Sequence, residues 1–360
     1  MGSVEESHAI RINPSSSHAF AKSILLSYGI PTDRADIVAD ALVLADLRGV
    51  DSHGINRLPS YIARIKAGVL ATDPVLEFEY KTPVLAILDA KNTFGFVAGS
   101  LAIDEGIKIA STYGLAVVGV KHSNHYGMAS TYILRAVQQG FAAFAFTNAS
   151  RSMPPWGGKE PLFGTSPFAV GVPGGQAGNF VLDMSPSVAA RGKIRKAARR
   201  GESIPEGYAL DKDGKPTTDA QAALDGVVLP IGGPKGSGLA MMMDIFGGLL
   251  TGAAFGGDVV DMNKDANTPQ NVGHWFLVYR PETFLGSKEE LHARMDKLLD
   301  RTRKCEKADG FERIYVSGEI EAEREMENRK MGILYTQGEI EALHQLAKEI
   351  GSKSMLEPMI

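Results

Sequence analysis

The chain has 360 residues, of which 44% are hydrophobic and 22% are charged, and its formal net charge at pH 7 is −4. This composition is typical of a globular protein with a sizeable core, and it argues against a disordered chain and against a nucleic-acid-binding protein. The single cysteine, Cys305, excludes an intrachain disulfide framework and is typical of a reducing compartment. The opening residues lack the apolar run of a secretory signal, so we expect a cytoplasmic protein.

The chain then divides into segments with helical and strand-like patterns. Helical patterns near the N-terminus cover residues 15–29, where serines are the candidate caps, 31–49 and 58–70. Apolar runs at 84–90, 115–123 and 141–148 alternate with helical patterns at 100–114 and 128–140, which predicts an α/β fold. The runs at 167–173 and 179–185 flank a Gly-rich turn and predict a hairpin, hence a mixed sheet. Charged helical patterns at 288–307, 319–332 and 336–351 close the chain.

The most apolar window, residues 239–257, is interrupted by Asp244 and several glycines. We expect a buried helix and its exit turn there, and no membrane span.

The glycines do not form a standard nucleotide-binding motif. Neither G-x-G-x-x-G after a predicted strand nor G-x-x-x-x-G-K-[ST] occurs. The segment IGGPKGSG instead places Lys235 among glycines just before an apolar helix. Amide groups at a helix start and a lysine favour an anion, so this segment is a candidate pyrophosphate site; a purely structural turn is the alternative.

The segment DSHGINR, residues 51–57, carries four groups able to do chemistry: Asp51, Ser52, His53 and Arg57. A helix cap is one interpretation. The other is a reaction centre, because histidine exchanges protons near neutral pH and an arginine binds a carboxylate through two hydrogen bonds. If a short helical turn follows Gly54, His53 and Arg57 share one face.

Two further histidines follow the apolar run at 115–123. His122 and His125 could ligate a metal, but no cysteine and no H-E-x-x-H pattern supports a zinc site. We therefore expect no metal and prefer a cofactor- or substrate-facing role for His125. His274 precedes another strand-like run and is either buried or part of a site. No G-x-S-x-G motif indicates a serine hydrolase.

Six segments in series resemble one known family. They are residues 51–68, 121–136, 146–173, 180–194, 216–240 and 273–284. Together they are similar to the malate/L-lactate dehydrogenase family that is unrelated to the common Rossmann enzymes. It includes malate, sulfolactate and ureidoglycolate dehydrogenases, diketogulonate reductase and piperideine-2-carboxylate reductase.

The resemblance implies a homodimer with a non-Rossmann nicotinamide-binding domain, built on a mixed, largely antiparallel sheet. We predict a mainly helical domain from residues 1–75 and 285–360 and the nicotinamide-binding domain over residues 76–284. The implied cofactor is NAD or NADP. The turn at 173–180, which approaches the adenine ribose in this family, has neither an acid for a 2′-hydroxyl nor an arginine for a 2′-phosphate, and we lean slightly to NAD.

The resemblance also implies roles for matched residues. His53 is the expected general acid/base, with Ser52 and Asp183 as its orienting partners, and Arg57 is expected to bind the substrate carboxylate. Which of His53 and His125 is the principal proton donor stays open. The resemblance also implies a set of residues that line the cofactor and active-site cleft. They are His125, Thr165, Ser166, Gly174, Gly175, Asp183, Lys235, Gly236, Gly318 and Glu319. Ser237 stands where many relatives carry an aromatic residue.

The function expected from the sequence is NAD(P)-dependent hydride transfer involving a small 2-oxo or 2-hydroxy acid, with malate/oxaloacetate first. Arg151 and Lys159 are either contacts for a second carboxylate or surface charges. The first alternative is a cyclic ketimine reductase that uses the same His53 and Arg57. The second is a non-catalytic nucleotide-binding protein. We expect a small carboxylate as partner, and neither nucleic acid nor membrane.

Overall fold

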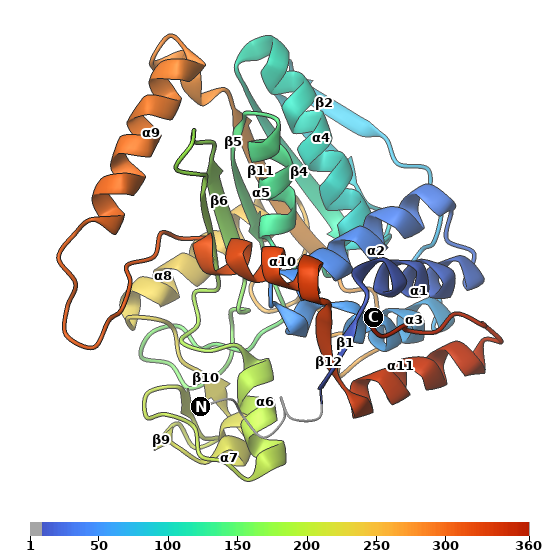
Figure 1. Ribbon diagram of the computed structural model, residues 1–360. Helices are drawn as coiled ribbons and strands as arrows, with labels where there is room; N and C mark the ends of the chain where they lie inside the picture. Colours follow the sequence, from blue (N-terminus) through green and yellow to red (C-terminus); the bar gives the residue numbers. More distant parts are fainter. Residues whose placement is uncertain (1–8, 360) are drawn as a thin grey trace.

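The computed structural model describes residues 9–359. The opening residues in which we expected no secretory signal include residues 1–8, which lie outside the described part. Figure 1 shows the arrangement of its elements. The main helices are α1 (Pro14–Ser27), α2 (Thr32–Leu47), α3 (Leu58–Lys66), α4 (Gly95–Tyr113), α5 (Ser130–Gln138), α6 (Arg191–Arg200), α7 (Ala220–Asp225), α8 (Pro234–Met243), α9 (Lys288–Arg303), α10 (Glu319–Met331) and α11 (Gln337–Glu349).

A seven-stranded sheet forms the centre of the molecule. Its strand order is β2 (Phe78–Thr82), β3 (Leu85–Asp89), β4 (Leu115–Ser123), β11 (Val272–Tyr279), β5 (Ala142–Thr147), β6 (Phe168–Val172) and β7 (Phe180–Met184). Only β3 and β4 pair in parallel; the other neighbours are antiparallel. The predicted mixed, largely antiparallel sheet is confirmed, as is the hairpin, in which Val172 lies opposite Phe180.

Apolar side chains cover both faces of this sheet. Helices α4 and α5 bury residues such as Ile103 and Ile133 against Val118 and Phe276. On the other face, Met243 of α8 packs with Phe146 and Phe168. Helices α4 and α5 thus cover one face, while α8 and η4 (Asp244–Leu249) cover part of the other.

The two ends of the chain share a second core. Helices α1, α2, α3 and α11 pack around buried residues such as Phe20, Leu42 and Leu343. Strands β1 (Ala9–Ile12) and β12 (Ile333–Thr336) pair antiparallel and contribute Ile12 and Tyr335 to the same core. Helix α9 lies apart from this group, alongside the sheet (Figure 1). The division into two domains at residues 75 and 285 stays a prediction.

A third, smaller core was not separated by the sequence patterns. Helices α6 and α7 pack with a small sheet of β8 (Ala209–Leu210), β9 (Pro216–Thr217) and β10 (Val227–Val228). Met153, Ile194 and Val228 are buried there.

Three local expectations differ from the structure. The side chain that caps α1 is Asn13, which accepts the Ser15 N–H, and not a serine. Strand β2 was not predicted, although Phe78 and Tyr80 alternate with Glu79 and Lys81; its side chains are mostly exposed. The expected buried helix over 239–257 is wrong in part: α8 continues into the π-helix η4 (Asp244–Leu249), and Met241, Leu250 and Phe255 are 52%, 56% and 48% exposed. Among residues 9–359, no helix is long and apolar enough to cross a membrane.

Candidate active site

The segment at 51–57 forms two short turns ahead of α3. One 3₁₀ turn covers Asp51–His53 and the second covers Ile55–Arg57, while Gly54 between them is extended. A short helical turn does follow Gly54, as considered from the sequence, but it is a 3₁₀ turn and His53 lies in the separate turn before it. The two functional side chains nevertheless stay close, since the charge of Arg57 lowers the pKa of His53.

His53 is held by its neighbour in the chain. The Ser52 hydroxyl lies 2.8 Å from Nδ1 of His53, the contact expected of an orienting partner. Burial of the ring, and after it the positive charge of Arg57, lower the pKa of His53 to about 4. The imidazole is therefore neutral at pH 7 in the free chain.

His125 reaches the same place from the loop after β4. Its ring stacks on that of His53, with centroids 5.3 Å apart, and the Tyr61 hydroxyl lies 2.8 Å from its Nδ1. Its backbone N–H donates to Oε1 of Gln270. Burial, Arg57 and His53 together hold the pKa of His125 well below its usual range. The structure thus brings together His53, Arg57 and His125, as the sequence predicted.

Arg57 carries the group best placed to receive an anion. Its Nε is buried and has no hydrogen-bond partner among the described residues. Burial raises the pKa of Tyr61 to about 12, and a hydrogen bond with Arg57 opposes that rise. A buried guanidinium N–H without an acceptor is costly, and an incoming carboxylate would satisfy it.

Three supporting residues were missed in the sequence. Tyr61 lies four positions after Arg57, so helical spacing on α3 was the signal that could have found it. Arg64, fully buried, donates to the carbonyl of Thr268 and to Oδ1 of Asn124, next to His125. Gln270 follows a loop with no sequence signal.

Asp183 is not paired with His53. Its Oδ2 instead accepts the backbone N–H of Ser130 at the start of α5, 2.7 Å away, and no bond to His53 occurs among residues 9–359. Loss of hydration raises the pKa of Asp183, and Glu321 raises it further. Its negative charge also reaches the buried Tyr126, next to His125. The expected orienting contact is therefore absent within one chain.

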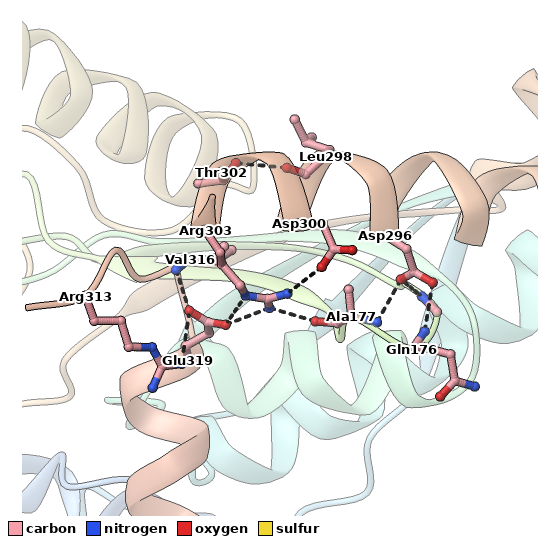
Figure 2. Close-up of polar contacts among 11 residues, drawn as sticks. Gln176, Ala177, Asp296, Leu298, Asp300, Thr302, Arg303, Arg313, Val316 and Glu319 are labelled. Atoms are coloured by element: carbon pink, nitrogen blue, oxygen red, sulfur yellow. Dashed lines mark hydrogen bonds and ion pairs between the residues drawn. The ribbon is translucent and has the colours of Figure 1, made fainter. Parts of the chain in front are cut away.

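The β6–β7 turn binds a carboxylate of the protein itself (Figure 2). The N–H groups of Gly175, Gln176 and Ala177 all donate to the carboxylate of Asp296 on α9, at 2.9–3.0 Å. These bonds are the main reason that the pKa of Asp296 is lowered. Gly174 donates to Oδ1 of Asn179. The turn has no acidic residue in its own sequence, but the fold places Asp296 of α9 against it.

Glu319 lies beside the same turn and is fully engaged (Figure 2). It accepts from Arg303 and from the Val316 N–H, each at 2.7 Å, while Arg303 also donates to the carbonyl of Ala177. Gly318, with φ of 93°, packs on β7 so closely that an added Cβ would lie 2.8 Å from the carbonyl oxygen of Val181. These residues tie the start of α10 to β7.

The glycine segment forms the amino end of α8. Lys235 is exposed in the first turn of this helix, and a Cβ at Gly238 would meet open space, so an anion has access. Gly236 packs against the backbone of Ile231. The Ser237 hydroxyl accepts the backbone N–H of Trp156, whose ring lies against Gly233. Trp156 therefore supplies an aromatic ring although position 237 is a serine.

The remaining candidates lie outside the histidine cluster. The carbonyl of Thr165 accepts a hydrogen bond from Ser185, and the Ser166 hydroxyl is buried without a partner among the described residues. His122 pairs with Asp89. His274 is buried between the hydroxyls of Thr147 and Ser123, one at each ring nitrogen. Of the two interpretations, this favours the buried histidine over a site residue. No cluster of three or more His, Cys, Asp or Glu side chains suited to a metal occurs within residues 9–359.

Comparison with known proteins decides the family. The family model described as malate/L-lactate dehydrogenase matches residues 12–344. The chain belongs to the malate/L-lactate dehydrogenase family. It is 38% identical to L-sulfolactate dehydrogenase of Methanocaldococcus jannaschii, over 94% of this chain and 97% of that one. It is 34% identical to ureidoglycolate dehydrogenase (NAD(+)) of Escherichia coli K12, over 90% and 91%.

Solved structures of the malate/L-lactate dehydrogenase family agree. The sulfolactate dehydrogenase from M. jannaschii superposes with a TM-score of 0.89 over 95% of this chain and 98% of that one, at 37% identity. The Δ1-piperideine-2-carboxylate reductase from Pseudomonas syringae pv. tomato gives 0.84 over 94% and 99%, at 28% identity. Dehydrogenases of the family use NAD or NADP. The resemblance inferred from the motifs is confirmed, and the protein is an oxidoreductase of the 2-hydroxy acid dehydrogenase type.

Proposed function

We propose that this protein transfers a hydride between a nicotinamide cofactor and a small 2-oxo or 2-hydroxy acid, with oxaloacetate/malate as the first candidate pair. The observation that carries the proposal is the convergence of His53, Arg57 and His125, in which the buried Nε of Arg57 lacks an acceptor. A 2-oxo acid presents a carboxylate and a carbonyl on adjacent carbons, and this cluster offers a guanidinium beside an imidazole.

Arg57 binds the substrate carboxylate in this proposal. The guanidinium forms charge-assisted hydrogen bonds, including one from the Nε that is otherwise unsatisfied. A bound carboxylate also cancels the positive charge that helps to hold the pKa of His53 near 4. Neutralising this second contribution raises the pKa of His53 toward its ordinary value, which favours protonation of the imidazole when the acid is bound.

His53 then donates or accepts the proton, depending on the direction of the reaction. A dihydronicotinamide, once bound, would supply the hydride for the carbonyl carbon, and the carbonyl oxygen would then require a proton. Since Ser52 engages Nδ1 of His53, Nε2 is the nitrogen left to donate it. In the opposite direction the neutral imidazole accepts the alcohol proton. His125, bonded to Tyr61, borders the same site and is the alternative proton donor.

The residues present fit a dinucleotide at two places. The exposed amino end of α8 with Lys235 suits a pyrophosphate. At the β6–β7 turn, the ionised Asp296 suits a ribose hydroxyl better than a 2′-phosphate. This carboxylate supports the slight preference for NAD over NADP.

We also propose a cytoplasmic homodimer. The exposed apolar side chains of α8 and η4 and of the segment that follows, Met241, Leu249, Leu250 and Phe255, form a surface that a second copy would cover. Light scattering after size-exclusion chromatography tests this directly. A dimer of the native protein that becomes a monomer in Leu250→Asp supports the assignment, and a native monomer contradicts it.

The experiment for the activity is a substrate panel. NADH and NADPH consumption is followed with oxaloacetate, pyruvate, sulfopyruvate and piperideine-2-carboxylate. Turnover of a 2-oxo acid supports the proposal, whereas turnover of the cyclic imine alone favours the ketimine reductase. Binding of NADH, seen by fluorescence, without any turnover contradicts an enzymatic role. Arg151→Ala, tested with oxaloacetate and pyruvate, shows whether this exposed residue contacts a second carboxylate.

A further inference from the structure

The backbone between His53 and Arg57 rests on a buried carboxylate. Asp46, near the end of α2, is buried, and its Oδ2 accepts the Ile55 N–H at 2.9 Å. The same oxygen accepts the Tyr335 hydroxyl of β12 at 2.8 Å. Its other oxygen, Oδ1, has no hydrogen-bond partner among the described residues.

That second oxygen lies against Gly54. A Cβ added to Gly54 would come within 1.6 Å of Oδ1 of Asp46, so no other residue fits between the carboxylate and the extended backbone there. Asp46 thus contacts Gly54 and Ile55, two of the three residues that separate His53 from Arg57. One contact is a hydrogen bond and the other is close packing, and together they fix the break between the two 3₁₀ turns.

Asp46 is itself anchored from the far end of the chain. Asn328 of α10 donates to the carbonyl oxygens of Asp46 and Leu47, at 3.4 and 2.9 Å. The neighbouring Arg48 pairs with Glu325 of the same helix at 2.8 Å. The carboxylate therefore belongs to a rigid assembly of α2, α10 and β12, rather than to the turn that it contacts.

We propose that Asp46 is a positioning residue, which sets the relative orientation of His53 and Arg57 by holding Gly54 and Ile55. This inference rests on the proposed function of the two side chains. Asp46 acts through the backbone, and no direct interaction with the ring of His53 occurs among the described residues. Errors of about 1 Å in the placement of catalytic groups cost roughly 10²-fold in rate, so the loss of this contact affects turnover.

The ionisation of Asp46 supplies a readout of this role. Burial, with smaller contributions from Asp51 and Glu339, raises its pKa to about 7, and the bonds from Ile55 and Tyr335 oppose this rise. An ionised carboxylate is the stronger acceptor. We therefore expect the hold on Ile55 to weaken as the pH falls through 7, and kcat/KM to decline with it.

Three variants separate positioning from stability. Asp46→Ala removes the acceptor, Asp46→Asn keeps an acceptor oxygen without charge, and Tyr335→Phe removes one of the two bonds. We expect kcat/KM to fall about 100-fold in Asp46→Ala and less than about 5-fold in Asp46→Asn, with the NADH dissociation constant within 2-fold in both. The acid limb near pH 7 disappears in Asp46→Asn. Asp244→Asn is the matched control, because Asp244 is also buried and accepts a backbone N–H, that of Gly256.

The outcomes decide the inference. Full activity in Asp46→Ala overturns it, as does an unchanged pH profile in Asp46→Asn. If Asp46→Ala does not fold, the folded Asp46→Asn and Tyr335→Phe variants decide by the pH profile and by a drop in kcat with unchanged NADH binding. His53→Ala is measured in parallel: an unaffected His53→Ala contradicts the proposed function itself, whereas a non-additive Asp46→Ala/His53→Ala pair shows that Asp46 acts through His53.

Discussion

The imidazole rings of His53 and His125 lie nearly parallel, 5.3 Å apart at an interplanar angle of 23°. Both are shifted toward the neutral form by burial and by Arg57. Two stacked rings beside one guanidinium cannot both be positively charged at neutral pH, so at most one of the pair is an imidazolium. A single substitution can therefore reveal which ring exchanges the proton with substrate.

We predict that His53→Ala lowers kcat by about 10²- to 10⁴-fold while NADH binding stays within 2-fold, because it removes the acid/base and leaves the cofactor contacts intact. Steady-state kinetics and NADH fluorescence titration measure the two effects. His122→Ala is the control, since that half-exposed histidine pairs with Asp89 outside the cluster. If His53→Ala loses only cofactor affinity, the acid role moves to His125.

Arg57→Ala is expected to lower kcat/KM for 2-oxo acids by about 10²- to 10³-fold, since about two charge-assisted hydrogen bonds to the carboxylate are lost. The corresponding 2-oxo amides, which lack that charge, lose much less. Arg135→Ala, which removes an exposed arginine paired with Asp104, is the control. An equal loss for acids and amides would mean that Arg57 serves the fold and not the carboxylate.

Local patterns predicted much of the fold, because a strand in the core must be apolar along its length. The run at 115–123 coincides with β4, and the hairpin follows from its Gly-rich turn. Strand β2 was missed although Phe78 and Tyr80 alternate with Glu79 and Lys81, because a five-residue strand at the exposed edge of the sheet gives only a short signal.

The candidate site likewise contains residues that the sequence predicted and residues that it did not. Sequence spacing predicted His53 and Arg57, while Asp296 reaches the β6–β7 turn from 119–121 residues away along the chain. Such long-range contacts leave no local signal, and neither did the buried contact between Asp46 and Ile55.

Asp296→Asn tests the cofactor preference. The amide keeps one acceptor oxygen for the turn but removes the charge beside it, so a 2′-phosphate is repelled less. We expect the ratio of kcat/KM with NADH to that with NADPH to fall about 10-fold. Glu290→Gln is the control, because it removes an exposed acid from the same helix. An unchanged ratio would separate Asp296 from cofactor recognition and leave it a purely structural role.

Two buried titratable groups, His274 and Asp46, are expected to affect the pH dependence of stability in opposite directions. His274 has its pKa lowered by burial to about 3, against an ordinary 6.5. Between these values the unfolded chain binds a proton that the folded chain does not, so acidification from pH 6.5 destabilises the fold. Asp46 behaves inversely: its pKa is about 7 when folded and ordinarily 3.8, so its contribution to stability is lost as the pH rises across that window.

Each group contributes about 1.4 kcal/mol per pH unit to the slope of unfolding free energy against pH. Urea titrations from pH 4.5 to 6 therefore give a slope that is shallower by about that amount in His274→Gln and steeper by about that amount in Asp46→Asn. The absolute stability of each variant also changes, because buried hydrogen bonds are altered, but this offset does not depend on pH. Unchanged slopes would show that the two groups titrate in the folded protein as they do in the unfolded chain, and slopes that move in the same direction would contradict one of the two pKa shifts.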